Sequence, residues 1–437
     1  MDSPAPRKLG HLSRHLPLKE TRMSESTINA ADTAWIIGAT ALVLMMTLPG
    51  LALFYAGMVR RKNVLATMAQ SAAATALVSI LWVVAGYSLA FVGGGDFIGT
   101  LDRFLMLGSG MESTNALATN IPEALFMIYQ MTFAVITVAL VAGSVAERLR
   151  FDAFLAFCIL WLFIVYVPSA HWVWGGGFLS QWGLLDFAGG TVVHINAGIA
   201  GLVAAYVLGP RLGLGKENLA PFDLSLAVVG TGLLWVGWFG FNGGSALSAG
   251  SRAVMAIVAT HLAACAGAFV WMMLEWWQRK KPSVLGIISG AVAGLGTITP
   301  ASGYILPWHG IVIGALAGGV CYWACTALKK RLKYDDTLDV FGVHGVGGIL
   351  GTLLAGVFAT GAVSATAASP EGLRGLIDGN PGQLGIQIAG VLVTVAWCAV
   401  ATWGILMAIK VFIGLRVDTD QEREGQDLAL HGESIHQ

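Results

Sequence analysis

Charge is what this sequence has least of. Only 11% of its 437 residues are Asp, Glu, Lys or Arg, whereas a soluble domain carries roughly 25%. Hydrophobic residues make up 56% of the chain, and the mean hydropathy is +0.72. This composition excludes an ordinary soluble protein and predicts an all-α polytopic membrane protein. The formal net charge is zero, which argues against nucleic acid as a partner.

Signatures of familiar enzymes and metal sites are also missing. No HExxH or GxSxG sequence occurs, and the glycine-rich run 209–217 is no phosphate loop, because Glu217 stands where Ser or Thr is required. The five cysteines form no CxxC pair and lie in apolar runs, so we interpret them as small core residues. We expect a protein that is not an enzyme, with no catalytic residue, no metal and no cofactor.

The two ends of the chain lack the apolar runs of its middle. Residues 1–30 contain no apolar stretch of the kind a secretory signal needs, and we expect a disordered N-terminal extension, with Met23 as an alternative start. Residues 31–413 form the predicted transmembrane domain. Residues 414–437 are charged and cannot form a core alone. We expect this tail to pack on loops around Arg148 and Lys330.

Long apolar runs fill the middle of the chain. Eleven of them approach the roughly 20 residues that a membrane-spanning helix needs. Their expected limits are 33–57, 64–92, 122–146, 151–170, 188–208, 222–244, 253–277, 284–300, 308–328, 340–361 and 384–413.

The charges between these runs are divided unequally, and they predict an orientation. One set of loops has fourteen cations: Arg60, Arg61, Lys62, Arg148, Arg150, Arg211, Lys216, Arg279, Lys280, Lys281, Lys329, Lys330, Arg331 and Lys333. The alternate set has three, Arg103, Arg252 and Arg374. Loops rich in Lys and Arg stay in the cytoplasm. Eleven spans then place the N-terminus outside and the C-terminus inside.

Two histidines occur in the same local pattern, 150 residues apart. His194 and His344 are each followed by a small residue at +3, Gly at +4, Ile at +5 and Gly at +7, and each has an Asp eight residues before it. An imidazole in an apolar run needs a partner or a purpose. The shared pattern indicates a duplicated element that has kept its imidazole.

The duplication extends beyond the histidines. Gly at −4 and +3 flanks both Phe54 and Phe241, at the ends of the first and sixth runs. Spans 1–5 therefore resemble spans 6–10, with span 11 extra. Because five is odd, the two repeats cross the membrane in opposite directions, and such inverted repeats place a transport path at their interface.

The rise of a helix, about 1.5 Å per residue, brings His194 and His344 towards the midplane from opposite faces. A pair of neutral imidazoles offers a donor and an acceptor, which suits a small polar permeant or a proton relay. Two separately satisfied histidines remain the alternative. Asp186 is interpreted as a helix cap that also adds negative potential below an outer mouth, and Asp339 as a cap alone. Trp174 fits either an aromatic belt or a cation–π platform.

At this point the residues resemble the ammonium transporter (Amt/Rh) family, on the bacterial Amt side. The resemblance runs from about Asp32 to Glu433. It rests on the stretches 49–55, 146–150, 174–177, 186–196, 237–242 and 339–345.

The resemblance implies a homotrimer of eleven-helix protomers in the inner membrane of a bacterium, each protomer with its own pore for ammonium and its analogue methylammonium. It implies an outer recruitment site of Trp174 and Ser245 with Phe133, supported by Asp186, a gate of Phe133 and Phe241, and a pore lined by His194 and His344. Trp238 and Thr299 match positions near the pore. The tail resembles the cytoplasmic segment where PII-type signal proteins dock. Tyr129 departs from the pattern, because relatives often have Phe there, and so does Ser302, where Cys is common.

Two other functions compete with transport. Histidines on two helices could ligate a haem, and an ammonium sensor would need little flux. Because no signalling domain follows residue 437, we expect transport. We expect the protein to recognise NH4+ and to remove its proton near the gate. NH3 then passes along the histidines, and a proton relay operates there.

Overall fold

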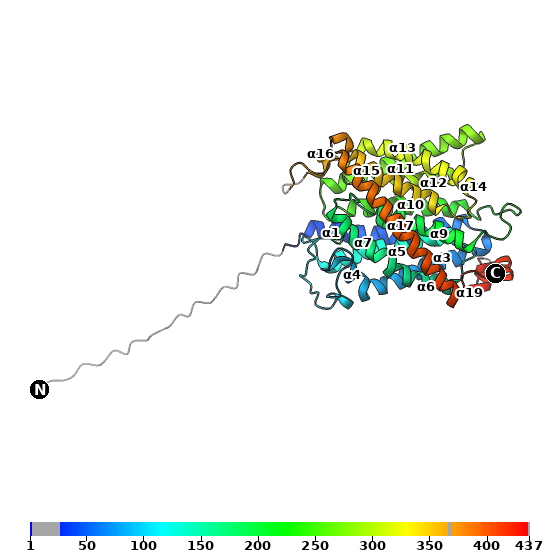
Figure 1. The fold of residues 1–437 in the computed structure, drawn as a ribbon, viewed down its shortest axis with the longest axis horizontal. Coiled ribbons are helices and arrows are strands. Elements are labelled where there is room, and N and C mark those ends of the chain that lie inside the picture. Colours follow the sequence, from blue (N-terminus) through cyan, green and yellow to red (C-terminus); the bar gives the residue numbers. More distant parts are fainter. Residues whose placement is uncertain (2–26, 366–368, 436–437) are drawn as a thin grey trace.

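A computed structural model describes residues 1, 27–365, 369–435 of the chain, and these form a bundle of helices that lie side by side (Figure 1). Apart from two isolated bridges, no β-structure occurs among the described residues. The disorder expected for the N-terminal extension concerns mostly residues 2–26, which lie outside this description. The all-α prediction is confirmed.

Ten helices of the described chain are long and apolar enough to cross a membrane, and one shorter apolar helix, α12 (Val284–Ile298), accompanies them. The first five are Ala30–Met58 (α1, η1, α2), Arg61–Phe91 (η2, α3, η3, α4), Glu123–Val145 (α5), Phe151–Gln181 (α6, η5, α7, α8) and Gly190–Leu208 (η6, α9). The others are Leu224–Gly243 (α10, η7), Ser251–Arg279 (α11), Pro307–Leu332 (α13, η8, α14), Phe341–Phe358 (η9, α15) and Pro381–Phe412 (α17). Short helices outside them are η4 (Phe104–Met106), α16 (Gly361–Ser364), η10 (Leu376–Asp378), α18 (Thr419–Glu424) and α19 (Gln426–His431).

Each of the eleven expected apolar runs overlaps one of these helices, but some boundaries were wrong. The first helix begins at Ala30, because the Asn29 side chain accepts hydrogen bonds from the amides of Ala31 and Asp32. Ala30, the last residue of the expected extension, is therefore the first residue of this helix. The fourth helix continues beyond residue 170 through α7 (Val167–Val173), so His171 lies inside a helix.

Close approach of helix backbones depends on glycine, as the high glycine content predicts for a membrane bundle. A Cβ on Gly294 of α12 would lie 2.2 Å from the carbonyl oxygen of Ala263, and one on Gly314 of α13 (Pro307–Trp323) would lie 2.2 Å from the same atom. A Cβ on Gly198 of α9 (Asn196–Leu208) would lie 2.1 Å from the amide nitrogen of Gly345. This last contact brings the two histidine segments together.

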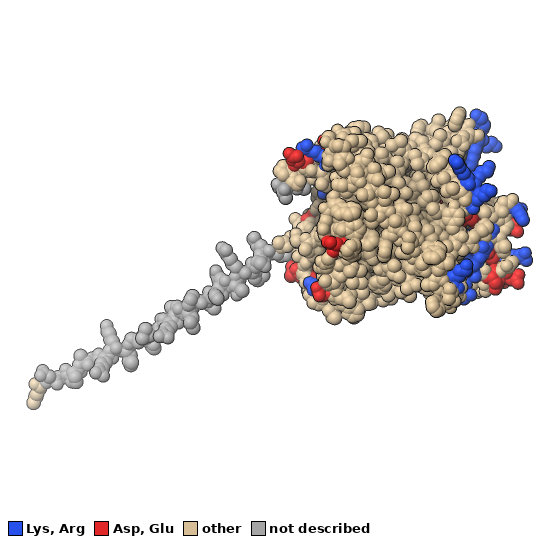
Figure 2. Space-filling view, in the orientation of Figure 1, with Lys and Arg blue, Asp and Glu red and all other residues tan. Residues whose placement is uncertain are grey.

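Lys and Arg gather at one end of the bundle, the end that also holds the C-terminal tail (Figures 1 and 2). The tail packs there on the loop after α5, where the Val417 amide donates to the carbonyl of Arg148 at 3.1 Å and the Arg150 amide to that of Leu415 at 2.9 Å. No hydrogen bond or ion pair between Lys330 and the tail occurs within the described residues, so the expected packing near Lys330 stays a prediction. Cys265 is exposed rather than a core residue.

Candidate functional site

Both repeated histidines lie in short π-helical turns. His194 belongs to η6 (Gly190–Ile195), which leads into α9, and His344 to η9 (Phe341–Gly345), which leads into α15 (Val346–Phe358). A π-turn inserts a residue into the helical register, and such turns are frequent at functional sites. The two histidine segments therefore share this π-turn as well as the sequence pattern around each histidine.

The two imidazoles meet in the interior. Nδ1 of His194 lies 3.2 Å from Nδ1 of His344, and the rings are nearly parallel, 11° apart with centroids 5.2 Å apart. One Nδ1 must donate and the other accept, so the two facing nitrogens share one proton. Nε2 of His194 is buried and has no hydrogen-bond partner among the described residues. Two axial nitrogens on opposite sides of a haem iron would be about 4 Å apart, twice a metal–nitrogen bond of about 2 Å, so the two facing nitrogens are too close to flank a haem iron.

Asp186 is a helix cap, as the sequence predicts. Its carboxylate accepts hydrogen bonds from the amides of Gly189 (2.7 Å), Gly190 (2.6 Å) and Thr191 (2.8 Å), and from the Thr191 hydroxyl. Gly189 has φ of 117°, a conformation that favours glycine. The carbonyl of Asp186 accepts from Nε1 of Trp174 at 2.8 Å. Asp186 therefore holds both the start of η6 and the indole.

The expectation that Asp339 acts as a cap alone was wrong. Its carboxylate pairs with Nζ of Lys329 at 2.7 Å. The side-chain cap of η9 is Asp336, whose carboxylate accepts from the amide of Phe341 at 2.7 Å. Asp336 is thus the structural counterpart of Asp186.

Phe133 of α5 and Phe241 of η7 (Phe239–Gly243) are stacked above the histidines, with ring centroids 4.2 Å apart. Trp174 meets Phe133 edge to face at 5.8 Å. Ser245 donates its hydroxyl hydrogen to the carbonyl of Phe241 at 2.8 Å. The serine oxygen therefore keeps its lone pairs for another donor.

Trp238 and Thr299 form a hydrogen-bonded pair beside His194. The Trp238 ring is stacked on His194 at 5.6 Å, and its Nε1 donates to the Thr299 hydroxyl at 2.9 Å. Trp238 therefore faces the histidine, whereas Thr299 holds the indole from behind.

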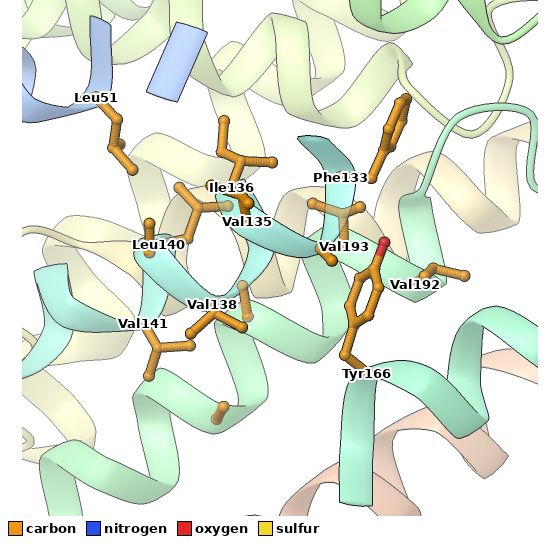
Figure 3. Packing of buried hydrophobic residues seen from close by; sticks show 14 of the residues in the cluster. Leu51, Phe133, Val135, Ile136, Val138, Leu140, Val141, Tyr166, Val192 and Val193 are labelled. Atoms are coloured by element: carbon orange, nitrogen blue, oxygen red, sulfur yellow. The ribbon is translucent and has the colours of Figure 1, made fainter. Parts of the chain in front are cut away.

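Three spaces follow one another along these residues. A pocket of about 240 Å³, called the outer pocket below, is lined by Phe133, Trp174 and Ser245 among others. A pocket of about 170 Å³, called the inner pocket below, reaches His344 and is lined by Arg211 at the charged end of the bundle. The space between them, bounded by Phe241, both histidines and apolar side chains, measures only about 10 Å³, which is the size of one water probe. Those apolar side chains include Leu51, Ile136, Leu140 and Val193 (Figure 3).

The role of Tyr129 could not be read from its departure from the family pattern. It lies one helical turn before Phe133, and its ring meets Phe133 edge to face at 5.1 Å. Its hydroxyl is 3.0 Å from the carbonyl oxygens of Gly240 and Phe241. Tyr129 thus fixes the turn that carries Phe241. The sequence did show that Tyr129 lies four residues before Phe133, on the same face of a helix. It did not show that η7 is a π-turn whose carbonyls can accept a hydrogen bond from Tyr129.

Comparison with known proteins identifies the family. The profile of the Ammonium Transporter Family matches residues 34–435. The chain is 46% identical over 408 residues to an ammonium transporter of Bacillus subtilis (93% of this chain, 98% of that protein) and 47% identical over 416 residues to one of Aquifex aeolicus (94% and 95%). The crystal structure of Saccharomyces cerevisiae Mep2 is similar with a TM-score of 0.84 and 37% identity, covering 90% of this chain and 89% of that one. This multi-pass membrane protein therefore belongs to the ammonium transporter family, and it transports ammonium.

Proposed function

We propose that the outer pocket recruits ammonium as the cation. The faces of aromatic rings attract cations, and Phe133 and Trp174 both line this pocket. The Ser245 oxygen, whose hydrogen points to the Phe241 carbonyl, offers lone pairs to an N–H donor. The carboxylate of Asp186 is occupied by backbone amides, so it supports Trp174 and contributes negative potential without direct contact.

Below this pocket the cation gives up a proton, and NH3 continues along the histidines. An unpaired charge is costly in an apolar, membrane-spanning interior, and the space beneath the stacked rings has room for about one small molecule. The observation that carries the proposal is the pair of facing imidazoles with the unpartnered Nε2 of His194. The pair offers NH3 hydrogen bonds and gives the released proton a return route. Ammonium currents of histidine variants, described in the Discussion, test this route.

The finer architecture is also a proposal. We infer eleven spans with α12 as the short eighth one, inverted repeats of spans 1–5 and 6–10, and an extra eleventh span. The matched π-turns η6 and η9, each capped by an Asp, support the repeats. A homotrimer with one pore per protomer follows from the family, and the pore residues all come from a single chain. Residues 31–413 are the proposed transmembrane domain, preceded by the N-terminal extension and followed by the tail 414–437.

The orientation proposed is N-terminus outside and C-terminus inside, in a bacterial inner membrane. Two single cysteine substitutions at exposed positions test this orientation. Ala220→Cys places a thiol in a loop at the end rich in Lys and Arg, and Glu371→Cys places one in a loop of the set that has only three cations. In intact cells an impermeant maleimide should label Glu371→Cys, whereas Ala220→Cys should react only after the membrane is opened. The unsubstituted chain is the control, because Cys265 is exposed. The reverse labelling pattern contradicts both the orientation and the inverted repeats.

The tail is the proposed docking place of a PII-type protein that closes the inner mouth. Its fixed position beside the inner loops supports this, because the Asp427 carboxylate accepts from the Ala66 amide at 2.7 Å and Glu422 from the Leu212 amide at 2.7 Å. Deleting residues 418–437 should weaken PII binding about ten-fold or more, which is about 1.4 kcal/mol. Binding of purified PII to the detergent-solubilised protein measures this. A chain shortened by residues 2–22 serves as the control, and equal affinity of all three chains counts against the tail.

A further inference from the structure

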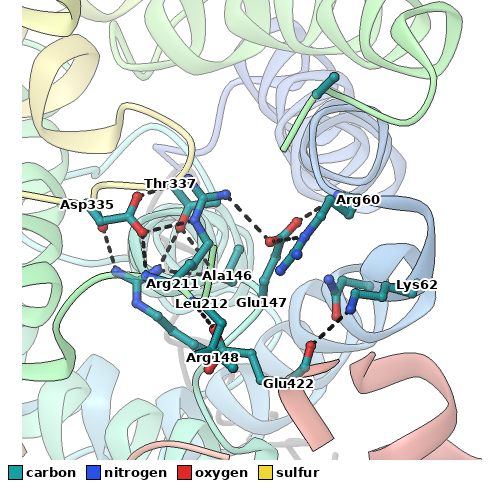
Figure 4. A network of polar contacts seen from close by, with 12 residues as sticks. Arg60, Lys62, Ala146, Glu147, Arg148, Arg211, Leu212, Asp335, Thr337 and Glu422 are labelled. Carbon is teal, nitrogen blue, oxygen red and sulfur yellow. Dashed lines mark hydrogen bonds and ion pairs between the residues drawn. The ribbon is translucent and has the colours of Figure 1, made fainter. Parts of the chain in front are cut away.

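Charged side chains from five segments form one network at the inner end (Figure 4). Glu147 pairs with Arg60 at 2.8 Å and with Arg211 at 3.6 Å. Arg211 pairs with Asp335 at 2.9 Å, and Nη2 of Arg148 donates to the Asp335 carbonyl. The tail joins through Glu422, whose carboxylate accepts from the Leu212 amide at 2.7 Å and also pairs with Arg416 of the tail itself at 2.8 Å. Lys62 completes the network by donating to the carbonyls of Glu422 and Arg423.

The charges of this network do not balance. Five cations (Arg60, Lys62, Arg148, Arg211 and Arg416) face three carboxylates (Glu147, Asp335 and Glu422), and each carboxylate side chain is at most 1% exposed. Burial lowers the pKa of Arg148 to about 10, so it stays charged near neutral pH. Burial would raise the pKa of Asp335, but its hydrogen bonds and ion pair with Arg211 hold that pKa below its usual value. Arg60 and Arg416 keep 13% and 29% of their side chains exposed, so part of the surplus positive charge lies at the surface, where an anion can reach it.

A pocket of about 250 Å³ opens on this network at the point where loop and tail meet. Four cations line it, Arg60, Lys62, Lys216 and Arg423, against two carboxylates, Glu217 and Glu422. Nη2 of Arg60 is buried without a hydrogen-bond acceptor in the described part of the chain. Lys216 and Arg423 are exposed, and neither has an ion pair with a described residue.

We propose that this pocket binds a phosphate group. A phosphate dianion would balance the pocket's own surplus of two positive charges, and its oxygens match the donors of a guanidinium fork and of ammonium groups. The cations come from the loop after α2 (Ala52–Met58), the loop after α9 and the tail, so a bound phosphate links all three. It therefore holds the tail on the inner face. The phosphate comes from a free anion or from the headgroup of an anionic lipid.

Titration of the full chain in detergent with inorganic phosphate, at ionic strength held constant with chloride, tests this site. We expect saturable binding by calorimetry and a phosphate-dependent rise in Tm. Lys216→Gln combined with Arg423→Gln should raise Kd at least about ten-fold, because both side chains line the pocket and are exposed enough to change without disturbing the fold. Lys330→Gln combined with Arg331→Gln is the matched control, since it removes the same charges from another exposed segment and should leave Kd unchanged.

The lipid source is distinguished in nanodiscs. If only anionic phosphatidylglycerol, and not free phosphate, raises Tm over neutral phosphatidylcholine, and the pocket variant loses that rise while the control keeps it, the phosphate belongs to lipid. Hydrogen exchange of residues 212–217 and of α18 should slow on binding in either case. The proposal is overturned if neither source binds, if chloride acts equally, or if the pocket variant and the control respond alike.

Discussion

Phe241→Ala should lower ammonium transport by at least about ten-fold, equivalent to about 1.4 kcal/mol in the barrier. The Phe241 ring is fully buried and stacked on Phe133 at 4.2 Å, directly between the outer pocket and the histidine pair. Removing the ring widens the space of about 10 Å³ beside the histidines. Water can then enter with the substrate, and the protein no longer controls where NH4+ gives up its proton. Uptake of labelled methylammonium, normalised to folded protein in the membrane, measures the loss.

Truncation of a buried Phe also costs roughly 3–5 kcal/mol of stability, so the variant needs a matched control. Phe157 is 3% exposed and stacked on Trp161 at 6.0 Å, outside the three pore spaces. Phe157→Ala should reduce the amount of folded protein but leave transport per folded molecule unchanged. Normal flux and selectivity in Phe241→Ala would return this residue to ordinary core packing.

His194→Ala and His344→Ala should each reduce ammonium current by about a hundred-fold or more, since a positioned group contributes about 10²–10⁴ to a proton-transfer step. Either change leaves the remaining Nδ1 without its partner at 3.2 Å and breaks the relay. The fold should persist, because backbone contact between Gly198 and Gly345 holds the two segments together. His309→Ala is the control: it removes another buried imidazole, whose Nδ1 accepts from the Leu306 amide outside the pore.

An aspartate in place of either histidine should act differently. His194→Asp and His344→Asp keep a group that binds a proton, but a carboxylate also offers negative charge to a cation. We expect these variants to conduct K+ and the wild type to exclude it. An Asp variant that excludes K+ and carries normal ammonium current would show that neither the charge nor the geometry of the imidazole matters there.

Much of the site could be predicted from sequence because its elements are repeated or periodic. The matched surroundings of His194 and His344 predicted a converging pair, and the spacing of apolar runs predicted the helices. The structure places the two rings in hydrogen-bond contact. Asp186 was predictable as a cap because it immediately precedes a glycine-rich helix start.

Other features depend on tertiary contacts that no local pattern encodes. The π-turns η6, η7 and η9 arise from packing, and they decide which way His194, Phe241 and His344 point. The cap of η9 is Asp336 rather than the expected Asp339, because the sequence does not reveal that Lys329 reaches Asp339. The charge network of the tail joins residues more than 200 positions apart, such as Leu212 and Glu422. The count of charged residues in the loops predicted at which end of the bundle this network lies, but not which residues pair with one another.

The central claim is that ammonium enters as a cation but crosses the histidine pair as NH3, with its proton handled separately. Charge translocation in proteoliposomes tests it most directly, with ammonium and K+ applied in turn to the wild type, His194→Ala and His344→Ala at equal protein density. The account predicts ammonium current without K+ current in the wild type and loss of the ammonium current in both variants. If both variants conduct ammonium normally and still exclude K+, the histidine pair is structural and the proposed mechanism is wrong.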